Sequence, residues 1–160
     1  EVIQSLDNPF DAVINVQGDE PLVDISQIDA LAKAMQQNTS DIATLVMWND
    51  NIEDYRNFNR VKCVRNLDGH ALYFSRSPIP HFQHEEHFTG FFKHLGMYAY
   101  STDFLRNLHQ LNPSKLEKAE SLEQLRWLDN GYKILTIETQ VETPSVDTPE
   151  DLQHILSHFL

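Results

Sequence analysis

An apolar strand, a polar loop and an amphipathic helix follow one another near the start of the chain, and this order constrains the fold most. Residues 11–16 (DAVINV) carry a continuous apolar run, which is typical of strands buried on both faces in parallel sheets. The loop 17–21 (QGDEP) breaks the strand, and residues 24–38 have the apolar spacing of a helix. A second apolar strand is predicted over residues 42–48. Strand, helix and strand in this order predict an α/β domain.

The middle of the chain predicts an insertion into that domain. Residues 61–64 and 71–75 flank an Asp-Gly turn at Asp68, which is typical of a β-hairpin. The other predicted elements are strands over 95–100 and 133–138 and helices over 102–111, 114–130 and from Thr148 onward. We expect residues 1–160 to form a single domain with a hairpin and loop insertion around 61–100.

Composition excludes several classes of function. The 160 residues carry 12 Lys and Arg against 24 Asp and Glu, a formal net charge of -12. This balance argues against general nucleic-acid binding and against docking on an anionic membrane. The single cysteine, Cys63, excludes an intrachain disulfide and a cysteine-based zinc site, and it suits a reducing compartment. No apolar run approaches the roughly 18 residues of a membrane helix, so we expect a cytoplasmic protein without nucleic-acid or membrane partners.

Acidic residues at two places in the chain are candidate metal ligands. Asp19 and Glu20 follow the first strand, where ligands bind in open α/β sheets, and their carboxylates suit Mg²⁺. The alternative is a simple turn. Asp147 directly precedes Thr148, the expected N-cap of the last helix, and is either a second metal ligand or a surface carboxylate stabilised by the helix dipole.

Other polar groups suggest a ligand site. Helical counting over 114–130 buries one side and leaves a second face for a polyol ligand, a partner subunit or plain solvent. The buried side comprises Ala119, Leu122, Leu125 and Leu128, and the second face Glu120, Glu123, Gln124 and Trp127. Arg76 and His94 could receive an anion. His81, His84 and His87 spread around a helix, so this stretch is expected to be a solvated loop instead of a metal site.

Five stretches, in order along nearly the whole chain, resemble one family, the 3-deoxy-manno-octulosonate (Kdo) cytidylyltransferases, also called CMP-Kdo synthetases. The stretches are 16–21 (VQGDEP), 73–80 (YFSRSPIP), 93–100 (KHLGMYAY), 120–126 (ESLEQLR) and 146–152 (VDTPEDL). The resemblance implies a three-layer α/β/α fold of the nucleotide-diphospho-sugar transferase type, with a mixed, mostly parallel sheet. It also implies a Mg²⁺-dependent reaction in which the 2-hydroxyl of Kdo attacks the α-phosphate of CTP. The products are CMP-Kdo, used in lipopolysaccharide biosynthesis, and pyrophosphate.

The resemblance assigns roles to individual residues. Asp19 and Asp147 match the catalytic, metal-holding aspartates, and Gln17 would contact the sugar or the nucleotide. The positions where the family binds the Kdo carboxylate and hydroxyls are Arg76, His94, Tyr98, Glu123 and Gln124. The family also implies a homodimer, with the insertion around 61–100 used in dimerisation.

The chain departs from the family pattern in two places. The basic segment that cradles the CTP phosphates lies upstream of residue 17 in the family and is absent here, so the N-terminal nucleotide-binding part is missing and these residues match the C-terminal two-thirds. After Pro80 the family often has an aromatic residue and then an arginine, where this chain has residues 81–84 (HFQH). Two alternatives stay open: a cytidylyltransferase for another acidic sugar such as a sialic acid, and a non-catalytic fragment that folds or dimerises without binding CTP.

Overall fold

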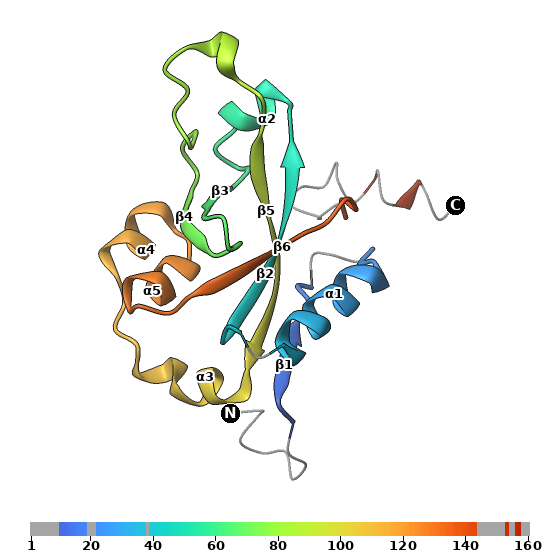
Figure 1. The fold of residues 1–160 in the computed structure, drawn as a ribbon, viewed down its shortest axis with the longest axis vertical. Helices are drawn as coiled ribbons and strands as arrows, with labels where there is room; N and C mark the ends of the chain where they lie inside the picture. The colour runs from blue at the N-terminus through green and yellow to red at the C-terminus, as the bar shows by residue number, and fades with distance from the viewer. Residues whose placement is uncertain (1–9, 19–21, 38, 144–152, 154–155, 158–160) are drawn as a thin grey trace.

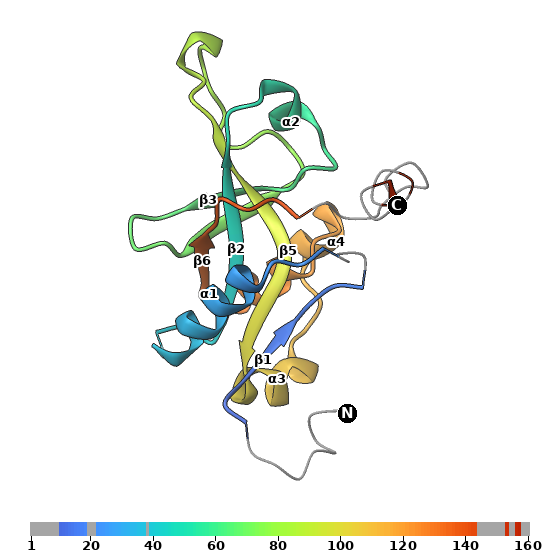
Figure 2. The same cartoon turned by 90° about the vertical axis from the view of Figure 1, so that its right-hand side faces the viewer.

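A mixed six-stranded sheet forms the centre of the computed structural model, which describes residues 10–18, 22–37, 39–143, 153 and 156–157 (Figures 1 and 2). The strands are β1 (Ala12–Asn15), β2 (Ile42–Asn49), β3 (Lys62–Arg65), β4 (Ala71–Ser75), β5 (Phe91–Ser101) and β6 (Ile134–Glu138). The helices are α1 (Ile25–Gln36), α2 (Ile52–Arg56), α3 (Thr102–Asn107), α4 (Lys115–Glu120) and α5 (Gln124–Asp129), with 3-10 turns at Glu85–His87 and Leu108–Gln110. Most predicted elements are therefore confirmed.

The long strand β5 organises the sheet. One of its edges pairs with β2 along the whole length, from Tyr100 opposite Ile42 to Phe91 opposite Asn49. Its other edge is shared, because β3 pairs near Phe92 and β1 pairs over the last four residues of β5. A register shift in the pairing with β2 falls between these two partners. His94 directly follows the residues that pair with β3, and Tyr98 pairs with the last residue of β1, so both lie near the point where these two partner strands end.

The sheet is mixed, as expected, but the described pairings are mostly antiparallel. The β2–β6 pair is parallel, whereas β1–β5, β2–β5, β3–β4 and β3–β5 are antiparallel. The strands β1, β2 and β6 do share one direction. The expectation of a mostly parallel sheet is wrong for the described strands because β5 returns from the hairpin insertion in the opposite direction and lies between β1 and β2.

Two apolar clusters fill the two sides of the sheet and make three layers. The helix α1 covers one face, where Leu31 and Ala34 pack with side chains of β2 and β5. The helices α3 and α5 cover the other face, where Phe104, Leu125 and Trp127 pack against β2, β4, β5 and β6. Figure 1 shows α1 on one side of the sheet and α4 and α5 on the other. This confirms the three-layer α/β/α arrangement.

Local signals explain where several elements begin. Asp24 caps α1 by accepting a hydrogen bond from the backbone N–H of Ser26 at 2.7 Å. The hairpin between β3 and β4 turns at Gly69, whose φ of 81° lies in the left-handed region that glycine tolerates. Cys63 lies in the core at 1% exposure, and burial raises the pKa of its thiol to about 12.

The predicted helix over 114–130 is two helices. Ser114 forms a capping box with Glu117 and begins α4, which ends at Ser121 in the left-handed conformation with φ 52°. The chain then starts again in α5. This break changes which side chains of the segment face the core.

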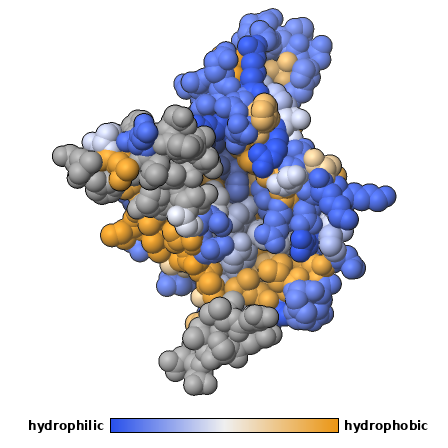
Figure 3. Space-filling model, turned by 180° about the vertical axis from the view of Figure 1, so that it is seen from behind, coloured by the Kyte–Doolittle hydropathy of each residue, from blue (hydrophilic) through white to orange (hydrophobic). Residues whose placement is uncertain are grey.

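The strand β1 is less covered than its apolar sequence predicts. Its residues are half-buried or exposed, and Val16 just beyond it is 39% exposed. Seen from behind, apolar residues gather on the lower part of the molecule, while the part that carries α2 and the long loop is mostly polar (Figure 3). Among the described residues, no helix has both the length and the hydropathy needed to cross a bilayer.

Candidate functional site

His94 and Tyr98 lie at the centre of the candidate site, on the face of β5 that α5 covers. Their ring centroids are 5.3 Å apart, and the His94 ring lies 5.0 Å from that of Phe74 on β4. Tyr98 also pairs across the sheet with Asn15 of β1 and packs at 5.2 Å against Trp127 of α5. The ends of β1 and β4 and the start of α5 therefore converge around the middle of β5.

The imidazole of His94 is held as one neutral tautomer. Thr44 Oγ1 lies 3.1 Å from His94 Nε2, and it donates its single proton to a backbone carbonyl, with Met97 O at 2.9 Å and Leu95 O at 3.3 Å. In this arrangement the hydroxyl accepts from the ring, and we infer that the ring proton lies on Nε2. Burial lowers the pKa of His94 to about 3, so the ring is uncharged at neutral pH.

The neutral ring corrects one expectation. His94 cannot join Arg76 as a positive charge for an anion. With Nε2 used as the donor to Thr44, Nδ1 is the ring atom left to accept a hydrogen bond. This atom suits a ligand hydroxyl.

Tyr98 presents a second uncharged group. It is 6% exposed, and its enclosed hydroxyl makes no hydrogen bond of ordinary geometry to a described residue. Burial, with smaller contributions from Tyr100 and Glu123, raises the pKa of Tyr98 well above its ordinary value of 10. Tyr98 is therefore a neutral phenol, and the nearby Thr44 side chain acts on its O–H, a contact that partly offsets the rise in the pKa of Tyr98.

Arg76 is fixed just beyond the end of β4. Its backbone N–H donates to Glu120 Oε2 at 2.9 Å, and its Nε donates to the Glu120 carbonyl oxygen at 2.9 Å. Its Nη1 donates to the Phe58 carbonyl oxygen at 3.3 Å. The guanidinium is half-buried and has no carboxylate in ion-pair contact within the described part of the chain.

The predicted polar face of the segment 114–130 is largely wrong. Helical counting fails because the backbone turns left-handed at Ser121. Trp127 is 2% exposed and belongs to the core, while Ala119, predicted to be buried, is exposed. Glu120 points to β4 and accepts from Ser75 Oγ at 2.6 Å.

Two members of that face stay near the site. Glu123 is exposed and lies close enough to Tyr98 and Tyr100 to raise the pKa of both. Gln124 is 6% exposed, and its amide makes no hydrogen bond to a described residue. The structure therefore brings His94, Tyr98, Glu123 and Gln124 to one side of the sheet, with Arg76 at the neighbouring strand end.

The remaining predicted site residues are placed only in part. Gln17 is exposed, two residues beyond Asn15 and thus beyond the end of β1. Asp19 and Asp147, the predicted metal ligands, lie outside the described residues, as does the predicted helix from Thr148. The described residues contain no cluster of three or more acidic, His or Cys side chains that could hold a metal ion.

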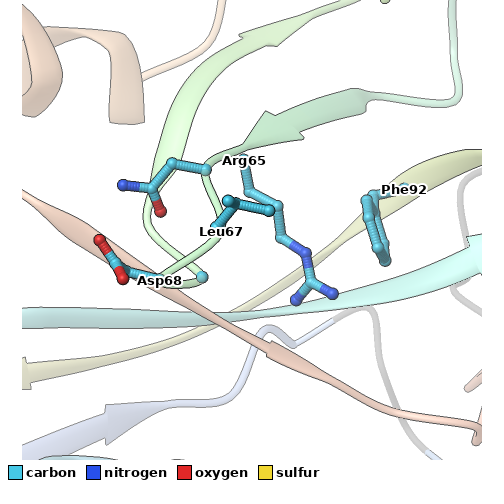
Figure 4. A pocket seen from close by; sticks show the side chains of 6 residues that line it. Arg65, Leu67, Asp68 and Phe92 are labelled. Atoms are coloured by element: carbon cyan, nitrogen blue, oxygen red, sulfur yellow. The ribbon is translucent and has the colours of Figure 1, made fainter.

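The His-rich loop agrees with its interpretation as a solvated loop. The rings of His84 and His87 meet edge to face with centroids 5.4 Å apart, and both residues are exposed, as are Glu85 and Glu86. A separate hollow of about 470 Å³ lies at the β3–β4 turn, where the Arg65 guanidinium packs 3.9 Å from the Phe92 ring centroid (Figure 4). None of the predicted site residues lines it.

Sequence reasoning missed Thr44 and Lys62. Both are fully buried polar residues on strands, at 0% exposure. A threonine within the apolar run 42–48 and a lysine at a strand start were the available signals, since buried polar groups need partners. Their partners come from distant parts of the chain, which the sequence does not identify.

The fold and the site agree with a nucleotide-transferring enzyme. A profile of the cytidylyltransferase family matches residues 1–134, and the chain belongs to this family. More narrowly, it groups with the 3-deoxy-manno-octulosonate cytidylyltransferases. It is 47% identical to that of Cytophaga hutchinsonii over 97% of this chain, and 42% identical to that of Geotalea uraniireducens over 99%.

Solved structures support the same assignment. The structure of CMP:2-keto-3-deoxy-manno-octonic acid synthetase complexed with CTP matches with a TM-score of 0.89 at 37% identity, over 99% of this chain and 66% of that one. HddC from Yersinia pseudotuberculosis shares the fold, with a TM-score of 0.61 at 14% identity. The match covers 99% of this chain and 59% of the HddC chain. The nucleotide-diphospho-sugar transferase fold is therefore confirmed.

The chain spans about two thirds of the length of its curated relatives. It covers 64% of the Cytophaga protein and 67% of the Geotalea protein. This share agrees with the two thirds expected from the sequence.

Proposed function

We propose that the protein containing this chain transfers a cytidylyl group from CTP to Kdo, giving CMP-Kdo and pyrophosphate. The observation that carries the proposal is the match, over nearly the whole chain, to a CMP-Kdo synthetase complexed with CTP, together with 47% identity to a relative named 3-deoxy-manno-octulosonate cytidylyltransferase. The site chemistry supports it. An acidic sugar presents one carboxylate and several hydroxyls, and the site offers one cation beside several neutral polar groups.

The neutral groups suit the hydroxyls of the sugar. His94 Nδ1 is an acceptor, the Tyr98 O–H is a donor, and the Gln124 amide is both. Glu123 adds an anionic acceptor at the exposed rim. Since buried polar groups without partners are costly, contacts of this kind favour a ligand with many hydroxyls over an apolar one.

Arg76 is the proposed partner of the sugar carboxylate. Its charge has no described counter-ion, and its guanidinium can bind a carboxylate through two parallel N–H groups. Gln17, beyond the end of β1, would contact the sugar or the nucleotide from the other side.

We propose Mg²⁺ as the cofactor, held by Asp19 and Asp147. Both are carboxylates, which are hard oxygen ligands for this cation, and the family resemblance carries the assignment. A bound Mg²⁺ would neutralise phosphate charge during the transfer. Asp19→Asn and Asp147→Asn should each abolish most activity, while Asp50→Asn, a change at an exposed acid that makes no ion pair with a described residue, serves as the control.

We also propose that the protein is a cytoplasmic homodimer serving lipopolysaccharide biosynthesis. The dimer surface would be the insertion around residues 61–100, where Leu72 is 60% exposed and Leu67 is fully exposed. Sedimentation of the wild type and of Leu72→Asp tests this assembly. A dimer that persists unchanged in the variant would argue against this surface.

A pyrophosphate-release assay tests the proposed activity. CTP, Mg²⁺ and either Kdo or a sialic acid are supplied to the complete reading frame that contains these residues and, separately, to the 160-residue chain. Release with Kdo by the complete protein supports the proposal. Release with the sialic acid alone would favour the other acidic sugar, and release by neither would leave a non-catalytic protein.

A further inference from the structure

Lys62 is a buried cation without a carboxylate in contact. It is 0% exposed, and its ammonium donates to three backbone carbonyls, those of Asn57, Arg60 and Arg76. An ammonium has three N–H donors, so all of them are used. Burying an ion costs free energy that hydrogen bonds to neutral carbonyls recover only in part. This lysine therefore joins two segments at one point, the loop between α2 and β3 and the residue that follows β4, Arg76.

Glu120 holds the same residue through other atoms. Its carboxylate accepts from the Arg76 backbone N–H at 2.9 Å and from Ser75 Oγ at 2.6 Å. Its own carbonyl oxygen accepts from Arg76 Nε at 2.9 Å. Arg76 is thus fixed at its backbone nitrogen, its carbonyl oxygen and its side chain.

The guanidinium is left with one free end. Nε donates to the Glu120 carbonyl and one Nη1 hydrogen donates to Phe58. The two hydrogens of Nη2 and the second hydrogen of Nη1 make no hydrogen bond within the described segments. The N–H groups at this end of the planar guanidinium have the spacing of the two oxygens of a carboxylate.

We propose that Lys62 and Glu120 are positioning residues that hold Arg76 with this free end ready for the carboxylate of the acidic sugar. This inference rests on the proposed function. Neither residue touches the sugar; both act through Arg76. A fixed arginine loses less conformational entropy on binding than a mobile one, so the two residues raise affinity for the anion without taking part in the chemistry.

The test separates positioning from general stability. Glu120→Gln keeps the size of the side chain but removes its charge and replaces one acceptor oxygen with a donor. The change should weaken binding of the sugar equally in the ground state and in the transition state. KM for the sugar should therefore rise about tenfold, while kcat and KM for CTP stay within about twofold of the wild-type values. Glu117→Gln is the matched control, since Glu117 lies on the same helix, pairs with Arg126 and does not touch Arg76. It should lower Tm and leave KM for the sugar unchanged.

An NMR readout keeps the inference testable whatever the activity. Exchange of the Arg76 backbone N–H proton, which is donated to Glu120 Oε2, should be slow in the wild type and in Glu117→Gln, and faster in Glu120→Gln, because a neutral amide is a weaker acceptor than a carboxylate. Lys62→Met should show the same faster exchange if the variant folds. If it does not fold, the result for Glu120→Gln alone tests the positioning role. Unchanged sugar KM in Glu120→Gln, or unchanged exchange of the proton, would overturn the positioning role. If the wild type releases no pyrophosphate yet the proton behaves as expected, the proposed function fails and the positioning of Arg76 stands.

Discussion

His94 Nε2 lies 3.1 Å from Thr44 Oγ1, and this contact determines which hydrogen bond the ring can offer to a ligand. The threonine hydroxyl gives its proton to a backbone carbonyl of β5, and we infer that the ring is the donor to Thr44. Thr44, on β2, thereby determines how His94, on β5, can hydrogen-bond to a ligand in the candidate sugar site.

The tautomer of His94 should be directly observable. We expect ¹⁵N NMR to show a neutral ring protonated at Nε2 throughout pH 5–8, because burial lowers the pKa of His94 to about 3. Thr44→Val removes the acceptor and should change the Nε2 resonance. Titration of His94 between about pH 6 and 7, the ordinary range for histidine, would contradict the assignment.

Stability should depend on pH through the same ring. The folded-state pKa of about 3 lies below the ordinary value of 6.5, so between these values the unfolded chain binds more protons than the folded one. The stabilising contribution is therefore full above pH 6.5 and is lost as pH falls toward 3, by up to about 1.4 kcal/mol per pH unit.

Comparison with His94→Gln isolates this effect in urea unfolding. Glu117 also loses stabilisation in acid, because its hydrogen bond to Arg126 lowers the pKa of Glu117, and the variant keeps that contribution. We expect a shallower acid slope in His94→Gln than in the wild type. Identical slopes would show that His94 is accessible to protons in the folded state.

Gly90 is required by its neighbours. It has φ 128°, and a Cβ there would lie 2.7 Å from the Trp48 ring and 2.8 Å from the Asn49 carbonyl oxygen. Gly90→Ala should therefore reduce the free energy of unfolding by more than about 2 kcal/mol. Gly131→Ala is the control, because Gly131 also has a positive φ, of 85°, but open space around its Cβ position. It should cost only about 1 kcal/mol, as expected for strain alone; equal losses in the two variants would argue against the Trp48 contact.

Trp127 should behave as a core residue. It is 2% exposed and packs against Tyr98, Tyr100 and Phe104 with ring centroids 5.2–5.8 Å away. Trp127→Ala should cost about 3–5 kcal/mol by chemical denaturation. Trp48→Ala, at a side chain 44% exposed, should cost clearly less. A small loss for Trp127 would instead support the exposed face predicted by helical counting.

Elements defined by local signals could be predicted from the sequence. The helix α1 follows its apolar spacing and its Asp24 cap, and the β3–β4 hairpin follows its Asp-Gly turn. The break at Ser121 could not be predicted, because serine carries no general preference for the left-handed conformation and only tertiary packing selects it. The antiparallel direction of β5 likewise depends on pairing with strands that lie far away in sequence.

The sequence could predict which residues belong to the candidate site, but not how their side chains are arranged. The sequence suggested His94 and Arg76 together as anion-binding groups, whereas burial leaves only Arg76 charged. The sequence predicted that Glu120 faces the ligand, whereas its carboxylate accepts a hydrogen bond from the Arg76 backbone N–H. Each difference comes from a long-range hydrogen bond or from burial, and neither is visible in residue spacing.

The most direct test of the central claim is pyrophosphate release by the complete protein with CTP, Kdo and Mg²⁺. The account predicts release that needs all three components, with Arg76→Lys raising KM for Kdo about tenfold or more because the fork geometry is lost. Absence of release with Kdo under conditions where the protein is folded would contradict it.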